Sequence, residues 1–210
     1  MDSRFYQRRG KREFDCVVAT LGLALLAPIF VVVALLVKLS SPGPVFYFQD
    51  RVGLNGRRFK IVKFRSMFED ADKRGLAITS SSDRRITPIG RLIRSLKIDE
   101  LPQLWNVLKG EMSLVGPRPE VPHYVESYSP EQRRVLTVRP GITDPATIAY
   151  RREQELLATQ TDPDRYYRDV VLPNKLNRNL EYLDRISLSY DLFLVLLTTF
   201  SLFSSKLSLK

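Results

Sequence analysis

Residues 16–37 of the chain read CVVATLGLALLAPIFVVVALLV, a run without a charged side chain that decides how the fold is organised. As a helix the run would extend about 33 Å, against a hydrocarbon core of roughly 30 Å. It is long for the apolar region of a secretory signal peptide, and Lys38-Leu39-Ser40-Ser41-Pro42 is not a small-residue cleavage site. A buried helix in a soluble core is the other interpretation. The run therefore predicts insertion into a membrane.

Cationic side chains flank this run on both sides. They are Arg4, Arg8, Arg9, Lys11 and Arg12 before it, and Lys38, Arg51, Arg57, Arg58 and Lys60 after it. Because cationic flanks favour the cytoplasm, a straight span would leave one flank on the wrong side. Pro28 removes a backbone donor near the middle of the run, but membrane helices tolerate such prolines, so it indicates a kink at most. We therefore expect a re-entrant helix, which enters and leaves through one leaflet, rather than a straight span.

The amino-acid composition limits which partners and which kinds of catalytic site the chain can have. Lys and Arg outnumber Asp and Glu by 33 to 23, and the formal charge of +10 suits an anionic partner such as acidic lipid, a phosphorylated substrate or nucleic acid. The cations are scattered and not interleaved with aromatic residues, which argues against nucleic acid. One cysteine, Cys16, excludes an internal disulfide, and one histidine, His123, excludes histidine-rich metal sites. Phosphate chemistry would then rest on carboxylates, Lys, Arg and a bound metal.

The middle of the chain has a helical pattern with a small strand component. Val45–Phe48 and Phe59–Phe64 read as strands, and Asn55-Gly56 between them is typical of a hairpin. Thr87-Pro88 supplies a capping residue and a first-position proline for a helix. Because helices predominate and do not alternate with strands, we expect a mostly helical α+β fold rather than a doubly wound sheet.

Asp99-Glu100 opens an amphipathic helix that should stop at Lys109-Gly110. Asp is a favoured N-cap and acids suit the first turn, so a purely structural role is one interpretation. The other is phosphate chemistry, since an Asp can attack phosphorus and carboxylates bind Mg²⁺. The cations that could hold phosphate oxygens beside the pair are Lys63, Arg65, Arg91, Arg94 and Arg118, the last stiffened by a proline on each side.

The run from Ile98 to Pro119, IDELPQLWNVLKGEMSLVGPRP, resembles the bacterial sugar transferases, the monotopic phosphoglycosyl transferases, in their small catalytic-domain form. The segments 51–53 (RVG), 63–67 (KFRSM) and 139–143 (RPGIT) fit the same family in the same order. The resemblance is close from Lys11 to Thr143 and looser beyond.

The resemblance implies a two-step reaction. Asp99 would attack the sugar-bearing phosphate of a UDP-sugar and expel UMP, and polyprenyl (undecaprenyl) phosphate would then take the phosphosugar. Asp99 would also bind Mg²⁺, and Glu100 would assist metal binding or proton removal. Phosphate would be held by Arg118, with Lys63, Arg65, Arg94 and Arg139 as further candidates. The implied setting is the cytoplasmic face of the bacterial inner membrane, at the first membrane step of surface glycan assembly, such as lipopolysaccharide or exopolysaccharide.

Three regions follow from these patterns. Residues 1–40 would form a basic arm and the re-entrant helix, 41–185 a compact cytosolic catalytic domain with the β-hairpin, and 186–210 a helix at the membrane interface. Within the last region, Leu192–Phe203 would reach only about 18 Å as a helix, too short to cross, and Tyr190 suits an interface. A core helix is the alternative for this segment.

The chain departs from the family pattern at two places. Members commonly break the membrane helix at a Ser-Pro pair, and the resemblance implies a break at Pro28, although Ala27-Pro28 stands at that place here. Asp144 follows Gly-Ile-Thr where many members continue with Gly-Trp. The sugar, the glycan pathway and the oligomeric state, a dimer included, therefore stay open.

Two other functions fit part of the sequence. A non-enzymatic, basic scaffold at the membrane surface explains the charge and the apolar segments, but it gives Asp99 and Arg118 no role. A glycosyltransferase that adds a sugar without its phosphate would release UDP instead of UMP.

Overall fold

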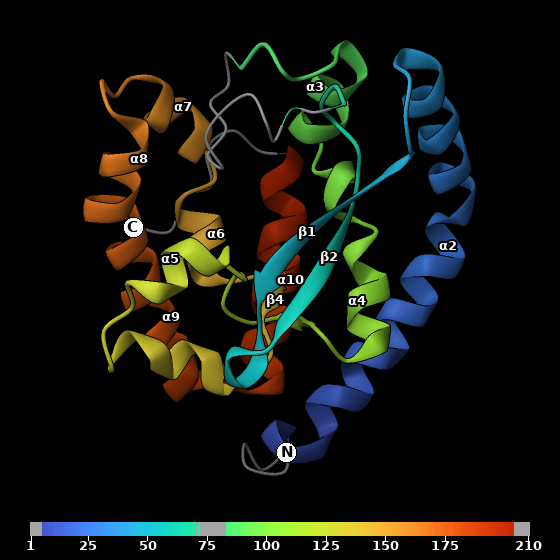
Figure 1. The fold of residues 1–210 in the computed structure, drawn as a ribbon. Coiled ribbons are helices and arrows are strands. Elements are labelled where there is room, and N and C mark those ends of the chain that lie inside the picture. The colour runs from blue at the N-terminus through green and yellow to red at the C-terminus, as the bar shows by residue number, and fades with distance from the viewer. Residues whose placement is uncertain (1–5, 70, 72–82, 204–210) are drawn as a thin grey trace.

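Helices predominate, and two small sheets complete the fold. A computed structural model describes residues 6–69, 71 and 83–203 (Figure 1). The helices are α2 (Lys11–Ser40), α3 (Pro88–Ser95), α4 (Gln103–Lys109), α5 (Pro122–Glu126), α6 (Pro145–Ala149), α7 (Glu153–Ala158), α8 (Pro163–Tyr166), α9 (Leu172–Arg185) and α10 (Leu188–Phe203). The strands are β1 (Phe46–Val52), β2 (Arg58–Phe64), β3 (Ser113–Val115) and β4 (Gly141–Thr143). The mostly helical α+β class predicted from the sequence is confirmed.

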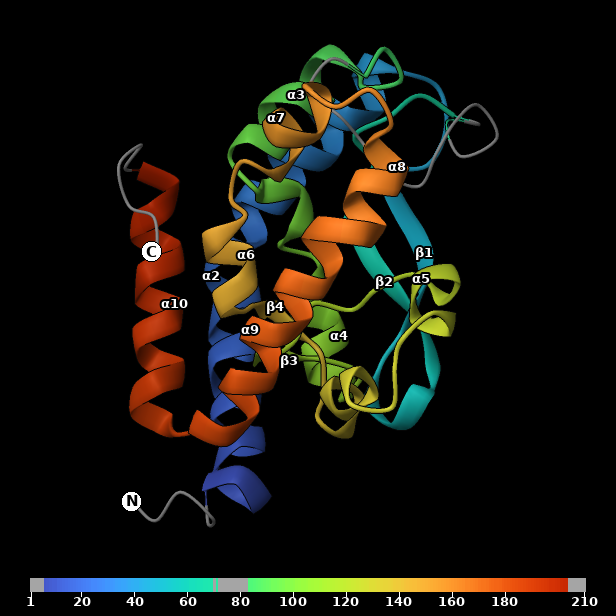
Figure 2. The same ribbon diagram turned by 90° about the vertical axis from the view of Figure 1, so that its left-hand side faces the viewer.

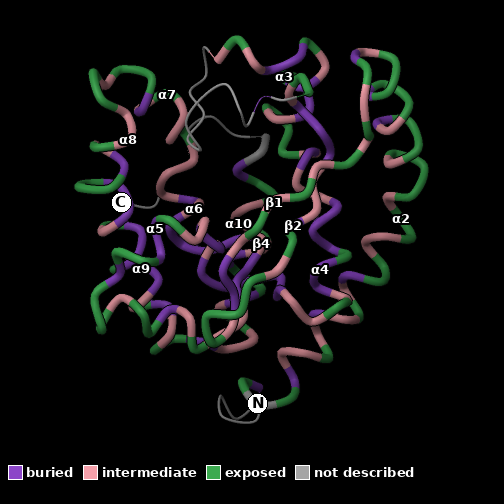
Figure 3. Tube along the Cα trace, viewed as in Figure 1, coloured by how far each residue is buried: buried purple, intermediate pink, exposed green. Residues whose placement is uncertain are grey.

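Helix α2 runs along one side of the molecule and carries a long apolar surface. Within the described residues it is the one helix that is long and apolar enough to cross a membrane, judged by length and composition alone. Much of its outer side is exposed, as the tube in Figure 3 shows. Leu21, Leu25 and Leu39 are among the apolar side chains that remain more than 60% exposed. Such a surface needs an apolar environment.

The helix break expected at Pro28 is not observed, and this prediction was wrong. The helix continues from Lys11 to Ser40 with Pro28 inside it, and Figure 1 shows α2 curving rather than ending. A proline removes one backbone donor and usually bends a helix without separating its halves when the packing on both sides continues. Here α4 packs so closely that a Cβ added at Gly22 would lie 3.1 Å from the Leu104 side chain.

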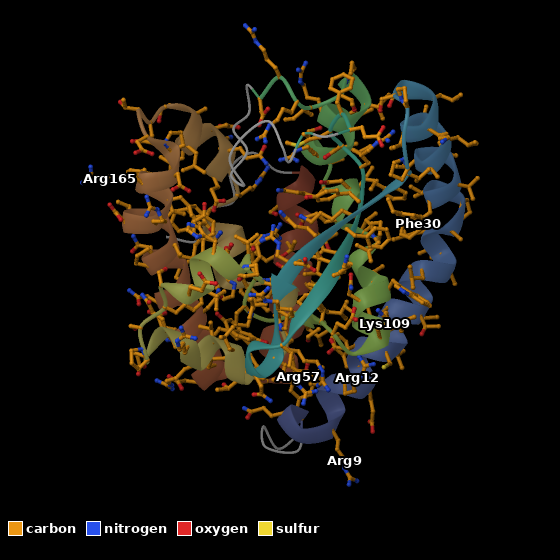
Figure 4. The ribbon with its side chains drawn as sticks, viewed as in Figure 1. Arg9, Arg12, Phe30, Arg57, Lys109 and Arg165 are labelled. Carbon is orange, nitrogen blue, oxygen red and sulfur yellow. The ribbon has the colours of Figure 1, made fainter. Side chains whose placement is uncertain are left out.

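Polar contacts fix the N-terminal end of α2 to the globular part of the chain. Arg12 donates to the carbonyls of Val107 and Leu108, the latter at 2.7 Å, so it caps the end of α4. Figure 4 shows Arg12 beside Lys109 at this end of α4. One turn further, the Asp15 carboxylate accepts from the Leu114 backbone N–H at 3.0 Å.

The C-terminal end of α2 is fixed to the same globular body. The apolar cluster around its last turns contains Val33, Val37, Phe64 and Ile93. Just beyond the helix, the Arg65 guanidinium donates to the carbonyls of Ser41 at 2.8 Å and Pro42 at 2.6 Å. Both ends of α2 therefore lie against one body, and neither projects away from it.

The predicted hairpin is confirmed. Strands β1 and β2 pair antiparallel from Phe46↔Phe64 to Val52↔Arg58. In the turn, Asn55 and Gly56 take positive φ values of 55° and 75°, which Asn and Gly adopt most readily. Asn106 of α4 holds the hairpin: its side chain accepts from the Val62 N–H at 3.0 Å and donates to the Lys60 carbonyl at 2.8 Å.

The second sheet is a short parallel pair. Ser113 of β3 lies opposite Gly141 of β4, and Val115 lies opposite Thr143. A Cβ added at Gly141 would lie 2.1 Å from the backbone nitrogen of Gly116, so this crossing admits no side chain there. The pair brings the segment before Arg118 against the segment before Asp144, which positions part of the site described below.

A buried polar cluster joins the two ends of the described chain. Asp191 of α10 is fully buried and accepts from the Tyr6 hydroxyl at 2.7 Å and the Tyr182 hydroxyl at 2.8 Å. Lys11 at the start of α2 forms an ion pair with the same carboxylate. Figure 2 shows α10 at the edge of the molecule, where Leu192, Phe193, Leu196 and Phe200 stay exposed.

This cluster gives a stability prediction. Lys11→Met should lower the free energy of unfolding by about 3 kcal/mol, because it leaves the Asp191 charge buried without its cation. Lys109→Met is the matched control, since Lys109 is 50% exposed and its pair with Glu111 should contribute at most about 1 kcal/mol. The measurement is equilibrium denaturation in detergent. Equal losses in the two variants would contradict a specific role for the buried pair.

Candidate active site

The Asp99-Glu100 pair lies in a tight turn before α4, not at the cap of that helix. Lys97 takes a left-handed backbone with φ of 56°, Ile98–Glu100 form one 3-10 turn, and α4 begins at Gln103. The Asp99 side chain caps no backbone N–H, so the purely structural interpretation of the pair as an N-cap is wrong. At the other end, Gly110 with φ of 81° stops the helix as predicted.

Glu100 is held between two cations from distant parts of the chain. Lys63 of β2 contacts one carboxylate oxygen at 2.8 Å. Arg118 binds both oxygens through its two terminal nitrogens, one of them at 3.1 Å. Burial opposes the charge of Glu100, but Arg118 and Lys63 outweigh it and hold the pKa of Glu100 well below its usual value. Glu100 is thus a fixed anion.

Arg118 owes its position to the backbone around it. Its N–H donates to the Asp144 carboxylate at 2.8 Å, directly after β4. The same carboxylate caps α6 through Thr147 and accepts from Asn179 of α9 at 3.0 Å. The β3–β4 pair and α9 therefore hold the guanidinium against Glu100.

Asp99, unlike Glu100, forms no ion pair with a neighbouring cation among the described residues. Its side chain is buried at 6% exposure, and Oδ1 contacts no hydrogen-bond partner among the described residues. Burial, and secondly the charge of Glu100, raise the pKa of Asp99 to about 6, while Lys63 and Arg94 act in the other direction. Asp99 is therefore a more basic carboxylate than its neighbour and has a lone pair that no side chain occupies.

Of the five cations that the resemblance suggested for phosphate binding, three lie at the Asp99-Glu100 pair and two lie elsewhere. The five are Lys63, Arg65, Arg94, Arg118 and Arg139. Arg118 and Lys63 contact Glu100, and Arg94 lies close enough to influence Asp99 while donating to the Ser66 hydroxyl at 3.3 Å. These three belong to the site. Arg65 instead binds the carbonyls that follow α2, as described above.

Arg139 also lies away from the Asp99-Glu100 pair. It donates to the Gly110 carbonyl at 3.0 Å, at the opposite end of α4 from Asp99. There it lines a cavity of about 300 Å³ with Lys11, Arg12 and Asp15. Lys11 and Arg12 form contacts there that join α2 to α9 and α4, so we assign the cavity a structural role.

The sequence reasoning missed a second buried ionic network beside the site. Arg51 of β1 donates to the Pro119 carbonyl at 3.0 Å and lies 3.6 Å from Glu120. Glu120 in turn accepts from the Tyr167 hydroxyl at 2.5 Å and lies 3.8 Å from Lys175. The segments 51–53 and 117–119, which fit the family pattern, were the signal in the sequence for this network. Its other members, on η6 (Tyr167–Val171) and α9, lie too far along the chain to be inferred from the sequence.

The residues of the site fit one divalent cation on a single carboxylate. No group of three or more His, Cys, Asp or Glu side chains suited to a metal occurs among the described residues. The free Oδ1 of Asp99 is a hard oxygen ligand, whereas both oxygens of Glu100 already bind cationic side chains. Mg²⁺ commonly binds through one or two carboxylates and the phosphates of a substrate, so Asp99 fits this ion better than Glu100 does.

The arrangement around Glu100 is testable without a substrate. Glu100→Gln leaves Lys63 and Arg118 without their anion, and the unfolding free energy should fall by about 3 kcal/mol. Inorganic phosphate should then raise the thermal midpoint more in the variant than in the unchanged protein, because it replaces the missing charge. Glu131→Gln is the control, since its pair with Arg134 is 63% and 49% exposed and should contribute at most about 1 kcal/mol. Equal responses to phosphate would refute the assignment.

Comparison with known proteins identifies the family. The model of the bacterial sugar transferase family matches residues 6–205. Three similar proteins are a UDP-N-acetylgalactosamine-undecaprenyl-phosphate N-acetylgalactosaminephosphotransferase of Aeromonas hydrophila (41% identical over 75% of this chain), an undecaprenyl-phosphate glucose phosphotransferase of Komagataeibacter xylinus (44% over 90%), and a UDP-glucose:undecaprenyl-phosphate glucose-1-phosphate transferase of Caulobacter vibrioides (39% over 93%). The chain spans 38%, 35% and 70% of the lengths of these relatives, respectively. The match along nearly the whole chain shows that it belongs to the bacterial sugar transferase family.

Proposed function

We propose that the chain transfers a sugar phosphate from a UDP-sugar to undecaprenyl phosphate and releases UMP. The observation that carries the proposal is the contrast within the Asp99-Glu100 pair: Glu100 is fixed between Lys63 and Arg118, whereas Asp99 is buried with a free oxygen. The names of the relatives, which describe transfer of sugar phosphates to undecaprenyl phosphate, support this substrate class.

Asp99 is the nucleophile in the proposed mechanism. Its free oxygen attacks the phosphorus that carries the sugar, a P–O bond to the rest of the nucleotide breaks, and UMP leaves with the bonding electrons. An acyl-phosphate on Asp99 then carries the sugar. A phosphate oxygen of undecaprenyl phosphate attacks the same phosphorus and releases the carboxylate. Because burial and the charge of Glu100 raise its pKa, the Asp99 carboxylate is a stronger base than that of Glu100, which favours it as the nucleophile of the pair.

The neighbouring residues stabilise the charge of the phosphates. Arg94 keeps a buried Nε without a partner among the described residues, so this donor is available to a phosphate oxygen. Arg118 and Lys63 add positive charge, and Glu100 keeps both in place. Mg²⁺ held by Asp99 would neutralise phosphate charge, which is the chemistry that this ion supplies when bound.

We propose that the site works at the cytoplasmic face of the bacterial inner membrane, with α2 as a re-entrant anchor that bends at Pro28 without separating its two halves. The exposed apolar side of α2 supports immersion in lipid. Because Arg12 at one end and Val37 near the other contact the same globular body, a straight span would have to separate contacts that the fold holds together. Cationic residues at both ends agree with this placement.

Nucleotide release tests the reaction. Purified protein in detergent receives Mg²⁺, undecaprenyl phosphate and a panel of UDP-sugars that includes UDP-glucose and UDP-N-acetylgalactosamine. We expect UMP, loss of turnover by at least about a thousandfold in Asp99→Asn, and loss after chelation of Mg²⁺. Arg139→Met is the matched control, which should turn over within about twofold of the unchanged protein when equal amounts are folded.

The alternatives have different outcomes in the same assay. UDP in place of UMP would indicate an ordinary glycosyltransferase. No nucleotide across the panel from folded protein would favour the scaffold. Without undecaprenyl phosphate, a burst of UMP close to one equivalent and a mass increase on the Asp99 peptide are expected, and release by direct transfer would show neither.

The membrane topology has its own test. In a Cys16→Ser background, Arg9→Cys and Lys38→Cys place thiols at exposed positions near the two ends of α2, and Figure 4 shows Arg9 pointing away from the body. An impermeant maleimide should label both positions in inverted vesicles and neither in intact spheroplasts. Labelling of the two positions from opposite sides would establish a straight span.

A further inference from the structure

Gln103 is a polar side chain close in sequence to Asp99-Glu100 that is buried without a hydrogen-bond partner among the described residues. It is fully buried at 0% exposure, and neither its amide nitrogen nor its amide oxygen has a partner among the described residues. A buried amide in this state destabilises a fold, because each unsatisfied group has lost its hydrogen bonds to water and gained none in the protein. Native proteins keep few such groups, and those they keep call for an explanation other than stability.

Asn106, one turn later in α4, is a buried amide whose hydrogen bonds give it a structural role, and it serves as the comparison for Gln103. It is equally buried, but its oxygen accepts from the Val62 N–H, and its nitrogen donates to the Lys60 carbonyl at 2.8 Å and to Glu111 at 2.7 Å. Its contacts tie α4 to β2. Gln103 makes no such tie, although it lies on the same helix at the same depth.

The position of Gln103 points to the reacting groups. Leu101 and Pro102 both have right-handed helical backbone angles, so the chain is helical from the turn of Asp99 into α4. Side chains four residues apart on such a segment lie about 5–6 Å apart at Cβ on one face. Glu100 and Asn106, three residues before and three residues after Gln103, both bind β2, Glu100 at Lys63 and Asn106 at Lys60 and Val62. The spacing of four residues therefore puts Gln103 on the same face of this segment as Asp99.

We infer that Gln103 binds the phosphate of the donor nucleotide, donating its amide N–H to a phosphate oxygen while Asp99 faces the phosphorus. The inference rests on the proposed function, which brings a nucleotide diphosphate to Asp99. A phosphate oxygen beside Asp99 satisfies the buried donor that the protein leaves open. The amide oxygen can accept from a water or hydroxyl that accompanies the phosphate. A neutral amide suits this position, because Asp99 and the phosphates already supply negative charge.

Two variants of α4 test the inference. Gln103→Met keeps the volume and removes the unsatisfied amide, whereas Asn106→Leu removes an amide with three hydrogen bonds. We measure the thermal midpoint without ligand, the Kd of UDP in the presence of Mg²⁺, and UMP release. UDP is the probe because it carries both phosphates whichever sugar is the true substrate.

The expected result separates binding from stability. Gln103→Met should keep or raise the thermal midpoint. It should raise the Kd of UDP at least about fivefold and slow UMP release at least about tenfold, because a hydrogen bond to a charged group is lost. Asn106→Leu should lower the midpoint by several degrees. A fall of the midpoint in Gln103→Met as large as that in Asn106→Leu would make the amide structural and overturn the inference, as would an unchanged Kd for UDP. Failure of the unchanged protein to release UMP would instead reject the proposed function.

Discussion

The ion cluster of Glu100, Lys63 and Arg118 is the interaction on which the site depends. Its three members come from the turn before α4, from β2 and from the loop after β3, so one buried anion holds three separate segments together. A buried charge is tolerated only when it is paired, and here two cations share it. Because Glu100 accepts the hydrogen bonds of both cations, Oδ1 of the neighbouring Asp99 keeps no hydrogen-bond partner among the described residues. In the proposed reaction, the structural and the chemical roles are thus divided between adjacent residues.

Helix α2 sets the second constraint, since the lipid acceptor of the proposed reaction must reach a charged site without the site entering hydrocarbon. The helix presents an apolar side to its surroundings, while its other side packs on α4, whose N-terminal end carries Asp99-Glu100. The polar ends of α2 stay with the globular body through Arg12 and the carbonyls bound by Arg65. One rigid contact therefore couples the depth of the apolar helix to the position of the carboxylates.

The sequence predicted correctly those turns and helix caps that depend on adjacent residues only. Asn55-Gly56 placed the hairpin turn, and Thr87 caps α3 through the Gly90 N–H at 2.8 Å as its dipeptide with Pro88 indicated. The Asp99-Glu100 pair was also found, but its division of roles depends on partners 18 and 37 residues away. Arg118 and Arg139 have similar local surroundings, each beside a proline, so only the tertiary structure distinguishes them. The three-residue strands β3 and β4 are too short to leave a periodic pattern.

Unsatisfied polar groups show where the fold gives up stability. Eight side-chain atoms are buried without partners among the described residues, and four of them, Asp99 Oδ1, Arg94 Nε and both amide atoms of Gln103, lie at or beside the turn that carries Asp99-Glu100. The other four belong to Arg65, Ser113, Thr147 and Asn179. By contrast, Asn106 on the same helix as Gln103 is fully bonded at the same depth. The Arg94 guanidinium and the Gln103 amide thus offer a charged and a neutral donor for the phosphate oxygens of the proposed reaction. Their desolvation occurs on folding, so a bound phosphate would recover hydrogen bonds that water no longer supplies, which is how a preorganised site favours its substrate.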